Sequence, residues 1–373
     1  MTLVESGFGK VADAFHRTVD DDGRSGAALS VWVDGAPVVD LWGGIADEHT
    51  GREFTSDTPA LTFSCTKGMA SVLVAMLMER GALPPLDSPV VEIWPEFGAH
   101  GKDRVSIGDA LAHRAGLSAP RRDLTIEEVL DNLLTADALA AQEPLWTPGE
   151  HHHYHAVTHG AITAKLVTLA TGRPIKDAFE EYVARPLKAD AWIGLPDSEQ
   201  SRVAHVVLDA LVENEPTADA ETVYWLERAI NLGCGFSLDR VNEPRFQRAG
   251  MAGVTGIASA SGLARIWSAT VTPTQGVRLI GDETVEALRT VRAEGPPFFD
   301  VGPPPYQSWG AGVMVPSDWE PYLSPASFGH DGAGGQVAFA DVDARVGFAY
   351  LTNRMVDWER GQSVVAALAE ALG

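Results

Sequence analysis

The amino-acid sequence predicts an α+β fold in which both ends of the chain contribute strands to one antiparallel sheet flanked by helices. Strand-like apolar runs gather near the two ends of the 373-residue chain, whereas helical patterns dominate between them. A chain of this length can bury a substantial core in one large domain or two interdependent domains. We therefore expect a sheet domain formed by residues 1–63 and 236–373, with a mostly helical domain inserted as residues 64–235.

The elements expected at the amino-terminal end are a helix and a hairpin. Residues 8–19 carry a helical pattern of apolar side chains. Residues 27–33 and 37–42 are predicted strands, and Asp34 and Gly35 lie between them. Asp-Gly between two apolar runs is a strong signal for a tight β-hairpin. The two strands should therefore be neighbours in the sheet.

The carboxyl-terminal end is expected to add three strands and a closing helix. The strand-like segments are residues 311–315, 336–341 and 346–351, and residues 357–372 have the pattern of an amphipathic helix. Two runs rich in glycine and proline, residues 295–299 and 302–306, are expected to be surface loops that could line a cleft.

The middle of the chain is expected to be mostly helical. Residues 68–78 are apolar on every side, which indicates a helix buried in the core, and the run is too short to span a bilayer. Further helical patterns, separated by proline and glycine, cover residues 107–112, 126–136, 158–171, 175–184 and 222–231. A sheet built from the two ends with a helical insertion between its halves follows from this order.

The composition excludes some classes of partner. The 28 basic residues are outnumbered by 51 acidic ones, and the formal net charge of −23 repels phosphate backbones and anionic lipid. We therefore expect no nucleic-acid partner and no membrane association. The first residues lack the basic start and apolar stretch of a secretory signal, so a cytoplasmic location is predicted. Cys65 and Cys234 are too few for a disulfide framework, and Cys65 is expected to be a small buried apolar residue.

The tetrapeptide Ser64-Cys65-Thr66-Lys67 is the strongest chemical signal in the sequence. Ser64 and Lys67 are three residues apart at the start of the predicted buried helix, so their side chains should share one helix face. A lysine whose charge is suppressed can withdraw or hold the serine proton, as covalent catalysis requires of a weak hydroxyl nucleophile. Short motifs occur by chance, but packing alone does not explain a serine and a lysine at the entry of a core helix. The motif indicates acyl transfer.

Acyl transfer also needs a second proton carrier, because a leaving group must be protonated and water must later be activated. Tyr154 is the candidate, and it lies in a histidine-rich stretch just before a predicted helix. A phenol has an ordinary pKa of about 10 and becomes a usable base only beside a fixed cation such as Lys67. The alternative is that Tyr154 only covers the start of the helix.

A glycine-rich segment, residues 328–336, leads into one of the predicted strands near the carboxyl end. Glycines allow a substrate to approach the backbone closely and leave amide donors free for a developing oxyanion. The alternative is a plain turn before a strand. By itself this segment only suggests a site.

The order of these three features resembles a known family. Ser64-x-x-Lys67, followed by Tyr154 and then by His330-Asp331-Gly332, is similar to the class C β-lactamase-like serine hydrolases, and most similar to the family VIII carboxylesterases within them. Other stretches that resemble family landmarks are Asp40-Leu41-Trp42-Gly43-Gly44, Leu86-Asp87-Ser88-Pro89-Val90, Leu111-Ala112-His113-Arg114-Ala115-Gly116-Leu117 and Ala258-Ser259-Ala260-Ser261-Gly262-Leu263-Ala264-Arg265. The resemblance spans almost the whole chain and implies a β-lactamase-like fold with an active site in the cleft between the two predicted domains.

Roles for individual residues follow from the resemblance. It implies that Ser64 is the acylated nucleophile, that Lys67 is its hydrogen-bonded activator, and that Tyr154 is the general base that becomes the general acid. It also implies an oxyanion hole formed by the amides of Ser64 and Ala333. The substrate-binding positions that it implies are Ala156, His330, Asp331 and Gly332. Whether Lys67 or Tyr154 takes the first proton stays open.

Two departures from the lactamase pattern favour ester substrates. Class C β-lactamases usually have Tyr-x-Asn and Lys-Thr-Gly, whose asparagine and lysine help to hold the amide and carboxylate of a lactam, but here those positions are Ala156 and His330. A methyl group cannot bind an amide, and a histidine is largely neutral at pH 7. We expect a cofactor-independent serine carboxylesterase that hydrolyses small short-acyl esters through an acyl-enzyme. A β-lactamase, amide hydrolase or acyltransferase on the same scaffold is the first alternative, and a non-catalytic binding protein is the second.

The histidine-rich stretch offers a competing metal hypothesis. His155 and His159 are four apart on a predicted helix and could bind a metal with a third histidine from residues 151–153. No glutamate lies between them as in His-Glu-x-x-His, so packing or rim roles are favoured and no metal is predicted. The sequence also lacks Gly-x-Ser-x-Gly, Gly-x-Gly-x-x-Gly and Walker motifs, which argues against an α/β-hydrolase and a nucleotide cofactor.

Overall fold

The computed structural model describes residues 2–19, 23–208, 218–300 and 302–373. The helices are α1 Gly9–Thr18, α2 Cys65–Glu79, α3 Ile107–Leu111, α4 Ile126–Leu130, α5 Asn132–Ala141, α6 Thr158–Thr171, α7 Ile175–Phe179, α8 Arg185–Leu187, α9 Ala220–Asn231, α10 Pro244–Ala249, α11 Ala260–Val271, α12 Asp282–Arg289 and α13 Glu359–Leu372. The strands are β1 Leu3–Val4, β2 Gly26–Val33, β3 Ala36–Asp47, β4 Arg52–Glu53, β5 Ala60–Phe63, β6 Ala191–Ile193, β7 Val207–Leu208, β8 Gly256–Ala258, β9 Ser308–Trp309, β10 Met314–Val315, β11 Ser327–Gly332, β12 Gln336–Asp341, β13 Val346–Thr352 and β14 Arg354–Met355.

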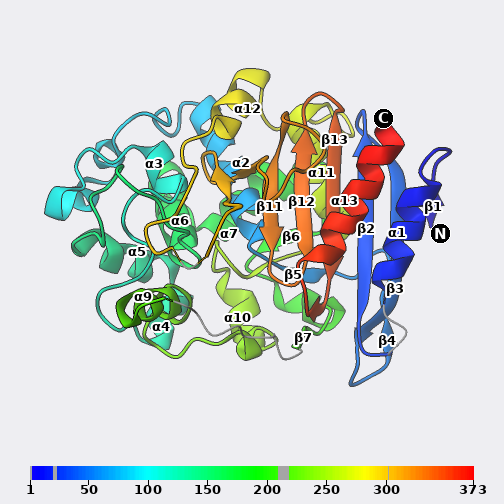
Figure 1. Ribbon diagram of the computed structural model, residues 1–373, viewed down its shortest axis with the longest axis horizontal. Helices are drawn as coiled ribbons and strands as arrows, with labels where there is room; N and C mark the ends of the chain where they lie inside the picture. Colours follow the sequence, from blue (N-terminus) through cyan, green and yellow to red (C-terminus); the bar gives the residue numbers. More distant parts are fainter. Residues whose placement is uncertain (1, 20–22, 209–217, 301) are drawn as a thin grey trace.

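The two ends of the chain meet in one antiparallel sheet, as the sequence predicts. Its strand order is β1-β3-β2-β13-β12-β11-β10-β9, and β4 pairs with β3 at one end. The central pair, β2 and β13, joins the amino-terminal hairpin to the carboxyl-terminal strands over seven residue pairs, from Val33↔Val346 to Ala27↔Thr352. Most of the helices between the two ends lie to one side of the sheet (Figure 1). The α+β fold class is therefore confirmed.

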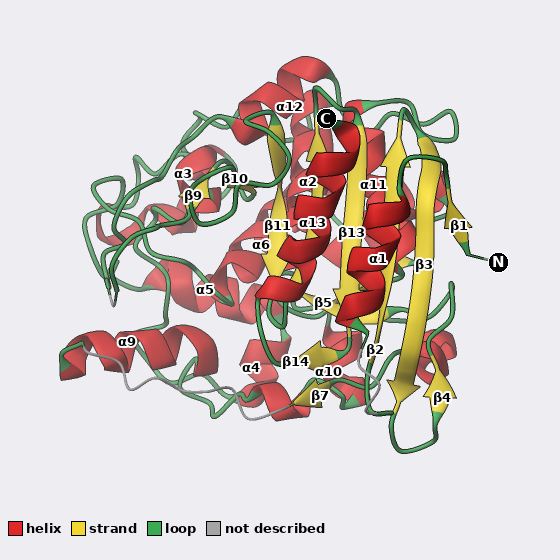
Figure 2. Ribbon diagram, turned by 45° about the vertical axis from the view of Figure 1, so that its right-hand side comes forward, coloured by secondary structure: helices red, strands yellow, loops and turns green. Residues whose placement is uncertain are grey.

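Helices cover both faces of the sheet. Alternate residues of β2 enter different cores: Leu29 and Val31 pack with Phe15 of α1, whereas Ala28 and Trp32 face the opposite core. Helices α1 and α13 lie side by side across the first face, as Figure 2 shows. Helix α11 packs on the second face beside α2. Burial on both faces explains why these antiparallel strands are continuous apolar runs without polar alternation.

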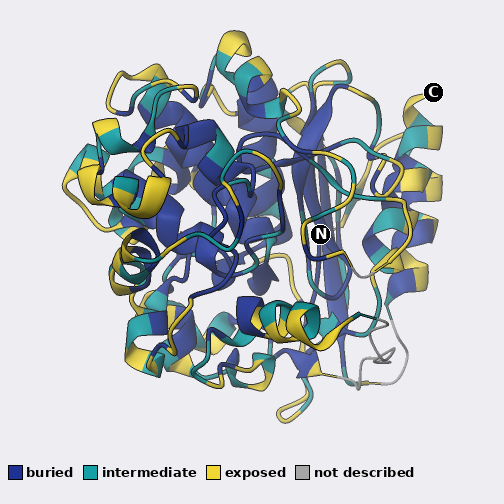
Figure 3. Ribbon diagram, turned by 60° about the vertical axis from the view of Figure 1, so that its left-hand side comes forward, coloured by how far each residue is buried: buried dark blue, intermediate teal, exposed yellow. Residues whose placement is uncertain are grey.

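The distribution of exposed residues follows the same layers. The middle strands are buried throughout, while α13 exposes residues along its outer side (Figure 3). Helix α2 is buried from Cys65 to Leu77, so the predicted core helix is confirmed. None of the described helices combines the length and apolar composition that crossing a membrane would require.

The predicted hairpin is confirmed in its details. Val33 pairs with Ala36, and the intervening Asp34 and Gly35 have φ angles of 52° and 77°. Positive φ at both central residues is what a two-residue turn between twisted strands needs. The other predicted strands and helices also occur, with three differences.

The differences arise where a cap or a turn overrides the apolar pattern. The predicted helix at 126–136 is broken, because Asp131 is extended and its carboxylate accepts from the backbone N–H groups of Leu133 and Leu134 at the start of α5. Only the last two residues of the predicted strand 311–315 are a strand, since Gly312 turns with a φ of 76°. The glycine-rich approach at 328–336 contains a full strand, β11, before its turn.

Candidate active site

Ser64 lies at the junction between strand β5 and helix α2. The backbone turns sharply there, because Phe63 has a left-handed conformation with a φ of 44°, which is uncommon for a residue with a side chain. The hydroxyl of Thr66 holds this turn: it donates to the Phe63 carbonyl oxygen and accepts from the backbone N–H of Gly256 on β8. The turn presents Ser64 to a cavity.

Lys67 reaches Ser64 as the helical spacing predicts. Its Nζ is 3.1 Å from Oγ of Ser64 and donates to the carbonyl oxygens of Ala156 at 2.7 Å and Gly253 at 2.8 Å. The side chain is fully buried, and this burial lowers the pKa of Lys67 from 10.5 to about 7. A neutral amine is therefore accessible near pH 7, which proton transfer from a serine requires.

A close approach of two glycines positions one acceptor of Lys67. Gly160 on α6 packs against the backbone at Gly253, and a Cβ at Gly160 would lie 2.0 Å from the Gly253 nitrogen. Gly160→Ala is expected to destabilise the protein by about 1–3 kcal/mol, because backbone on both sides must move. It should also lower any activity that depends on Lys67, since the Gly253 carbonyl would be displaced from this side chain. Urea denaturation and ester hydrolysis measure the two effects.

The matched control is Gly9→Ala at the start of α1, where no atom lies within 4 Å of the added Cβ. We expect unchanged or slightly raised stability there, because alanine has the higher helix propensity. Equal stability of the Gly160→Ala and Gly9→Ala proteins would contradict the assigned packing role.

Tyr154 meets Ser64 from the other side. Its hydroxyl donates to Oγ of Ser64 at 2.8 Å, and its ring stacks on Trp309 with centroids 5.2 Å apart. Nζ of Lys67 lies 4.8 Å from the ring centre. Despite this neighbour, burial raises the pKa of the Tyr154 phenol above its ordinary value of 10. The geometry joins the three predicted residues, and the raised pKa favours a phenol that keeps its proton.

Strand β11 and its turn form another side of the cavity. Gly332 allows β11 to approach β5, because a Cβ there would lie 2.6 Å from the Thr62 carbonyl oxygen. Beyond it, Ala333 lines the cavity together with Ser64 and Asp331. Neither the amide of Ser64 nor that of Ala333 donates a hydrogen bond to another residue that the structure describes.

The two positions that depart from the lactamase pattern have different environments. Ala156 lines the cavity, and its carbonyl oxygen is occupied by Lys67. His330 is 2% exposed and is not among the residues that line the cavity. Burial, followed by the charge of Lys67, lowers the pKa of His330 to about 3, so the imidazole is neutral. Its Nδ1 lies 2.7 Å from the Asp331 carbonyl oxygen.

The cavity at Ser64 has a volume of about 460 Å³ and mostly apolar walls. Ile230 of α9, Trp319 and Trp358 line it and remain partly exposed. A second cavity of about 280 Å³ adjoins it and shares Tyr154, Gln307 and Trp319. The predicted glycine- and proline-rich loops line this second cavity, among them Gly295, Pro297, Gly302 and Pro303.

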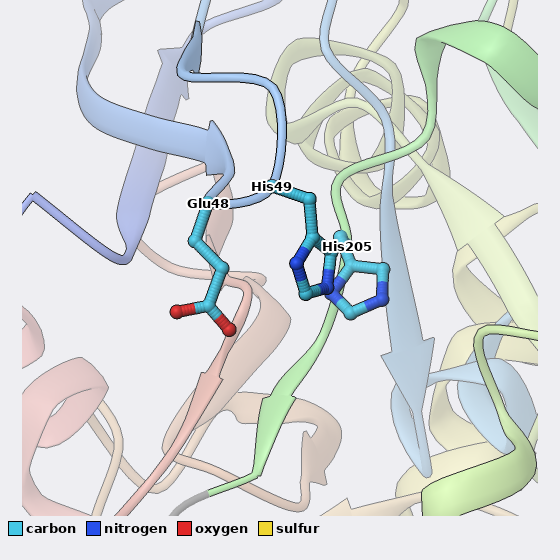
Figure 4. A group of neighbouring side chains, drawn as sticks. All are labelled: Glu48, His49 and His205. Carbon is cyan, nitrogen blue, oxygen red and sulfur yellow. The ribbon is translucent and has the colours of Figure 1, made fainter.

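The histidines of residues 151–159 do not form a metal site in the described structure. His155 is occupied at both ring nitrogens, since Nε2 accepts from the backbone N–H of Leu117 and Nδ1 lies 2.6 Å from the His153 carbonyl oxygen. The described residues bring together one group with suitable ligand atoms, Glu48, His49 and His205 (Figure 4). Glu48 and His49 lie on the β3–β4 turn and His205 lies just before β7, all outside the cavity at Ser64, and Glu48 already pairs with Arg24 at 2.9 Å.

Sequence reasoning missed three contributors to the site. Gly253 supplies an acceptor to Lys67, Trp309 supports the ring of Tyr154, and Glu320 lies behind Asp331. Gly253 and Trp309 act from segments distant in sequence from their partners, whereas Glu320 lies in the loop that leads into the strand of Asp331. No local motif marks any of the three. The close contact between Gly160 and Gly253 is likewise invisible before the chain folds.

Comparisons with known proteins agree with this geometry. The Beta-lactamase family model matches residues 11–372. An esterase/beta-lactamase, LipL of Mycobacterium tuberculosis, is 31% identical over 352 residues, which cover 89% of this chain and 77% of LipL. The solved structure of EstA from Arthrobacter nitroguajacolicus Rue61a is 31% identical with a TM-score of 0.89, covering 100% of this chain and 98% of EstA. The crystal structure of a family VIII carboxylesterase is 30% identical with a TM-score of 0.88, and the match covers 100% of this chain and 99% of the carboxylesterase.

Proposed function

Because this chain belongs to the β-lactamase family and is similar to family VIII carboxylesterases, we propose that it hydrolyses small short-acyl esters through an acyl-enzyme on Ser64. The observation that carries the proposal is the convergence of Lys67 and Tyr154 on one oxygen, Oγ of Ser64, at 3.1 and 2.8 Å. Ser64 accepts hydrogen bonds from a lysine whose pKa is lowered and from a phenol, and it lies at the wall of an apolar cavity. A serine in these surroundings is arranged for nucleophilic attack.

Lys67 takes the first proton in this mechanism. When its amine is neutral, two N–H groups satisfy the carbonyl oxygens of Ala156 and Gly253, and the lone pair faces Oγ of Ser64. The serine proton moves to Nζ as Oγ attacks the ester carbonyl carbon. The amides of Ser64 and Ala333, which have no acceptor among the described residues, donate to the oxyanion.

Tyr154 acts as the general acid for the leaving group. Its raised pKa keeps the phenol protonated, so the hydroxyl can donate a proton to the departing alkoxide, and the ammonium of Lys67 then restores the phenol. In the second half the transfers run in reverse: Tyr154 passes its proton to Lys67 and takes one from the water that attacks the acyl carbon. Lys67 then returns a proton to Oγ of Ser64 as the bond to the acyl group breaks. No metal or cofactor is required by any of these steps.

Two side chains favour esters over lactams. Ala156 offers no side-chain hydrogen bond to the amide that a lactam carries, and the neutral, buried His330 offers no charge to its carboxylate. An ester with a short acyl chain needs neither group. The apolar walls of the cavity suit the alkyl part of such a substrate.

The test compares two chromogenic substrates on the same protein. We expect 4-nitrophenyl acetate to be hydrolysed with a kcat/KM at least about tenfold above that of a chromogenic cephalosporin, a difference of about 1.4 kcal/mol in transition-state stabilisation. Efficient cephalosporin turnover with negligible ester turnover would refute the esterase proposal and support the lactamase alternative. Transfer of the acyl group to an added alcohol in place of water would favour the acyltransferase alternative.

A further inference from the structure

A group of metal-ligating side chains lies where two segments far apart in the chain meet. Glu48 and His49 are on the turn between β3 and β4, and His205 is just before β7. Each side chain offers one ligand atom, and the three atoms lie within 4.8 Å of one another (Figure 4). None of these residues lines the cavity at Ser64, so the group is separate from the catalytic residues.

The two histidines face each other across this junction. Their ring centroids are 4.6 Å apart, and the ring planes make an angle of 79°. Nδ1 of His205 is buried and has no hydrogen-bond partner among the described residues. Buried polar atoms of native proteins are nearly always paired, and a bound ion is one way to pair a ring nitrogen. The lone pair of His205 is therefore accessible to an ion at the junction.

The carboxylate of Glu48 is held by a neighbouring cation. Its Oε2 accepts from Nε of Arg24 at 2.9 Å. Carboxylates that bind metals are themselves hydrogen-bonded, and the outer partner fixes their orientation. An ionised carboxylate has about four lone-pair sites on its two oxygens, so the contact with Arg24 leaves sites for an ion. The ion pair thus supports a ligand role for Glu48.

Backbone contacts fix the two segments against each other. The N–H of His205 donates to the Ala46 carbonyl oxygen at 2.7 Å, and Nδ2 of Asn353 donates to the His205 carbonyl oxygen at 2.9 Å. On the turn, the Asp47 carboxylate accepts from the backbone N–H of His49 at 3.0 Å. Because the backbone of both segments is held in this way, little chain ordering is needed when an ion binds.

An adjoining cavity gives access to the junction. It has a volume of about 430 Å³, and His205 lines it together with the polar side chains of Asp47, Gln200 and Asn242. Three protein ligands leave the fourth position of a tetrahedral ion to water. Water can reach that position from this cavity.

We propose that Glu48, His49 and His205 bind one Zn²⁺ ion, which ties the β3–β4 turn to the segment before β7. Two imidazole nitrogens and a carboxylate oxygen suit Zn²⁺, whereas Mg²⁺ and Ca²⁺ prefer oxygen ligands alone. Bonds of about 2.0–2.2 Å place the ligand atoms of a tetrahedral site about 3.4 Å apart, so the exposed His49 side chain turns inward on binding. The ion stabilises the fold and takes no part in ester hydrolysis.

Zinc binding to the full chain, stripped with EDTA and then dialysed, tests the proposal. Calorimetry with ZnCl₂ should show one ion per chain. The melting temperature should rise by about 2–4 °C at a zinc concentration about tenfold above Kd. MgCl₂ and CaCl₂ at the same concentration should not raise it. Absence of saturable zinc binding would overturn the proposal, as would an equal rise with CaCl₂.

Substitutions locate the ion. His49→Ala and His205→Ala should each weaken zinc binding at least about tenfold, because each removes one of three protein ligands. His49 is exposed, so its substitution keeps the test valid should His205→Ala fold poorly. His16→Ala is the matched control, since it removes an exposed histidine of α1 and should leave Kd unchanged. An unchanged Kd in His49→Ala would place the ion elsewhere and overturn the proposal.

Ester hydrolysis separates this site from the proposed function. We expect kcat/KM for 4-nitrophenyl acetate to be the same before and after removal of zinc, because the three ligands lie outside the cavity at Ser64. Zinc binding without turnover of any ester would refute the esterase function and leave the metal site standing. A tenfold or greater loss of turnover that zinc restores would contradict a purely structural ion.

Discussion

Ser64→Ala is expected to reduce kcat/KM for 4-nitrophenyl acetate by at least about 10⁴-fold, because the variant has no oxygen that can form the acyl-enzyme. The hydrogen bonds from Lys67 and Tyr154 would lose their common acceptor, so these residues should not sustain turnover alone. Intact-mass spectrometry after exposure to a fluorophosphonate should show one adduct on the wild-type protein and none on the variant.

Ser71→Ala is the matched control for this prediction. Ser71 lies on the same helix, is fully buried and does not line the cavity. Its hydroxyl donates to the Gly312 carbonyl oxygen, and the two oxygens are 2.9 Å apart. This variant should lose about 1 kcal/mol of stability and keep its fluorophosphonate adduct. Retained ester hydrolysis in Ser64→Ala, or an adduct mapped to another serine, would remove Ser64 from its assigned role.

Lys67→Met should lower kcat/KM by about 10³- to 10⁴-fold, because methionine has a similar length but cannot accept the serine proton. The wild-type protein should show the charge state of this lysine in its pH profile. Burial lowers the pKa of Lys67 to about 7, so the neutral, active form dominates above pH 7. Activity should therefore fall about tenfold per unit as the pH decreases below about 7 and reach a plateau above it.

Lys102→Met provides the control for loss of a buried lysine. Lys102 is also fully buried and donates to two backbone carbonyl oxygens, those of Ala99 and Gln142, but it lies outside the cavity. Its replacement should change the melting temperature without changing the pH profile of the remaining activity. A wild-type profile that stays flat between pH 5 and 8, or Lys67→Met activity within tenfold of wild type, would contradict the role of Lys67 as the base.

Burying the charged form of Lys67 is unfavourable, and this same burial lowers its pKa. A lysine that must be neutral near pH 7 is buried where carbonyl oxygens are its acceptors, and three neighbouring elements hold it: α2, the segment before α6 and the segment before β8. The close packing of Gly160 on Gly253 keeps one of these acceptors in place. Stability and activity are therefore coupled at this contact, which is why the Gly160→Ala protein should lose both.

Local features of the fold were predictable because neighbouring residues encode them. The Asp34-Gly35 turn, the apolar helix α2 and the strands β12 and β13 lie where the pattern placed them. The break at Asp131 was not predicted, since a side chain that caps one helix competes with the apolar pattern of a longer one. The assignment of residues 1–63, 236–373 and 64–235 to two domains stays a prediction.

The sequence by itself determined the pairing of Ser64 with Lys67, because a spacing of three residues on a helix brings side chains together whatever surrounds them. Its order of motifs also predicted the family. Only the tertiary structure decided how these groups behave, since burial and counter-charges depend on segments far apart in the chain. It brought Tyr154 to Ser64, lowered the pKa of Lys67 and kept His330 neutral. The charge state of a buried group depends on all the segments that pack around it, so a local sequence pattern does not predict it.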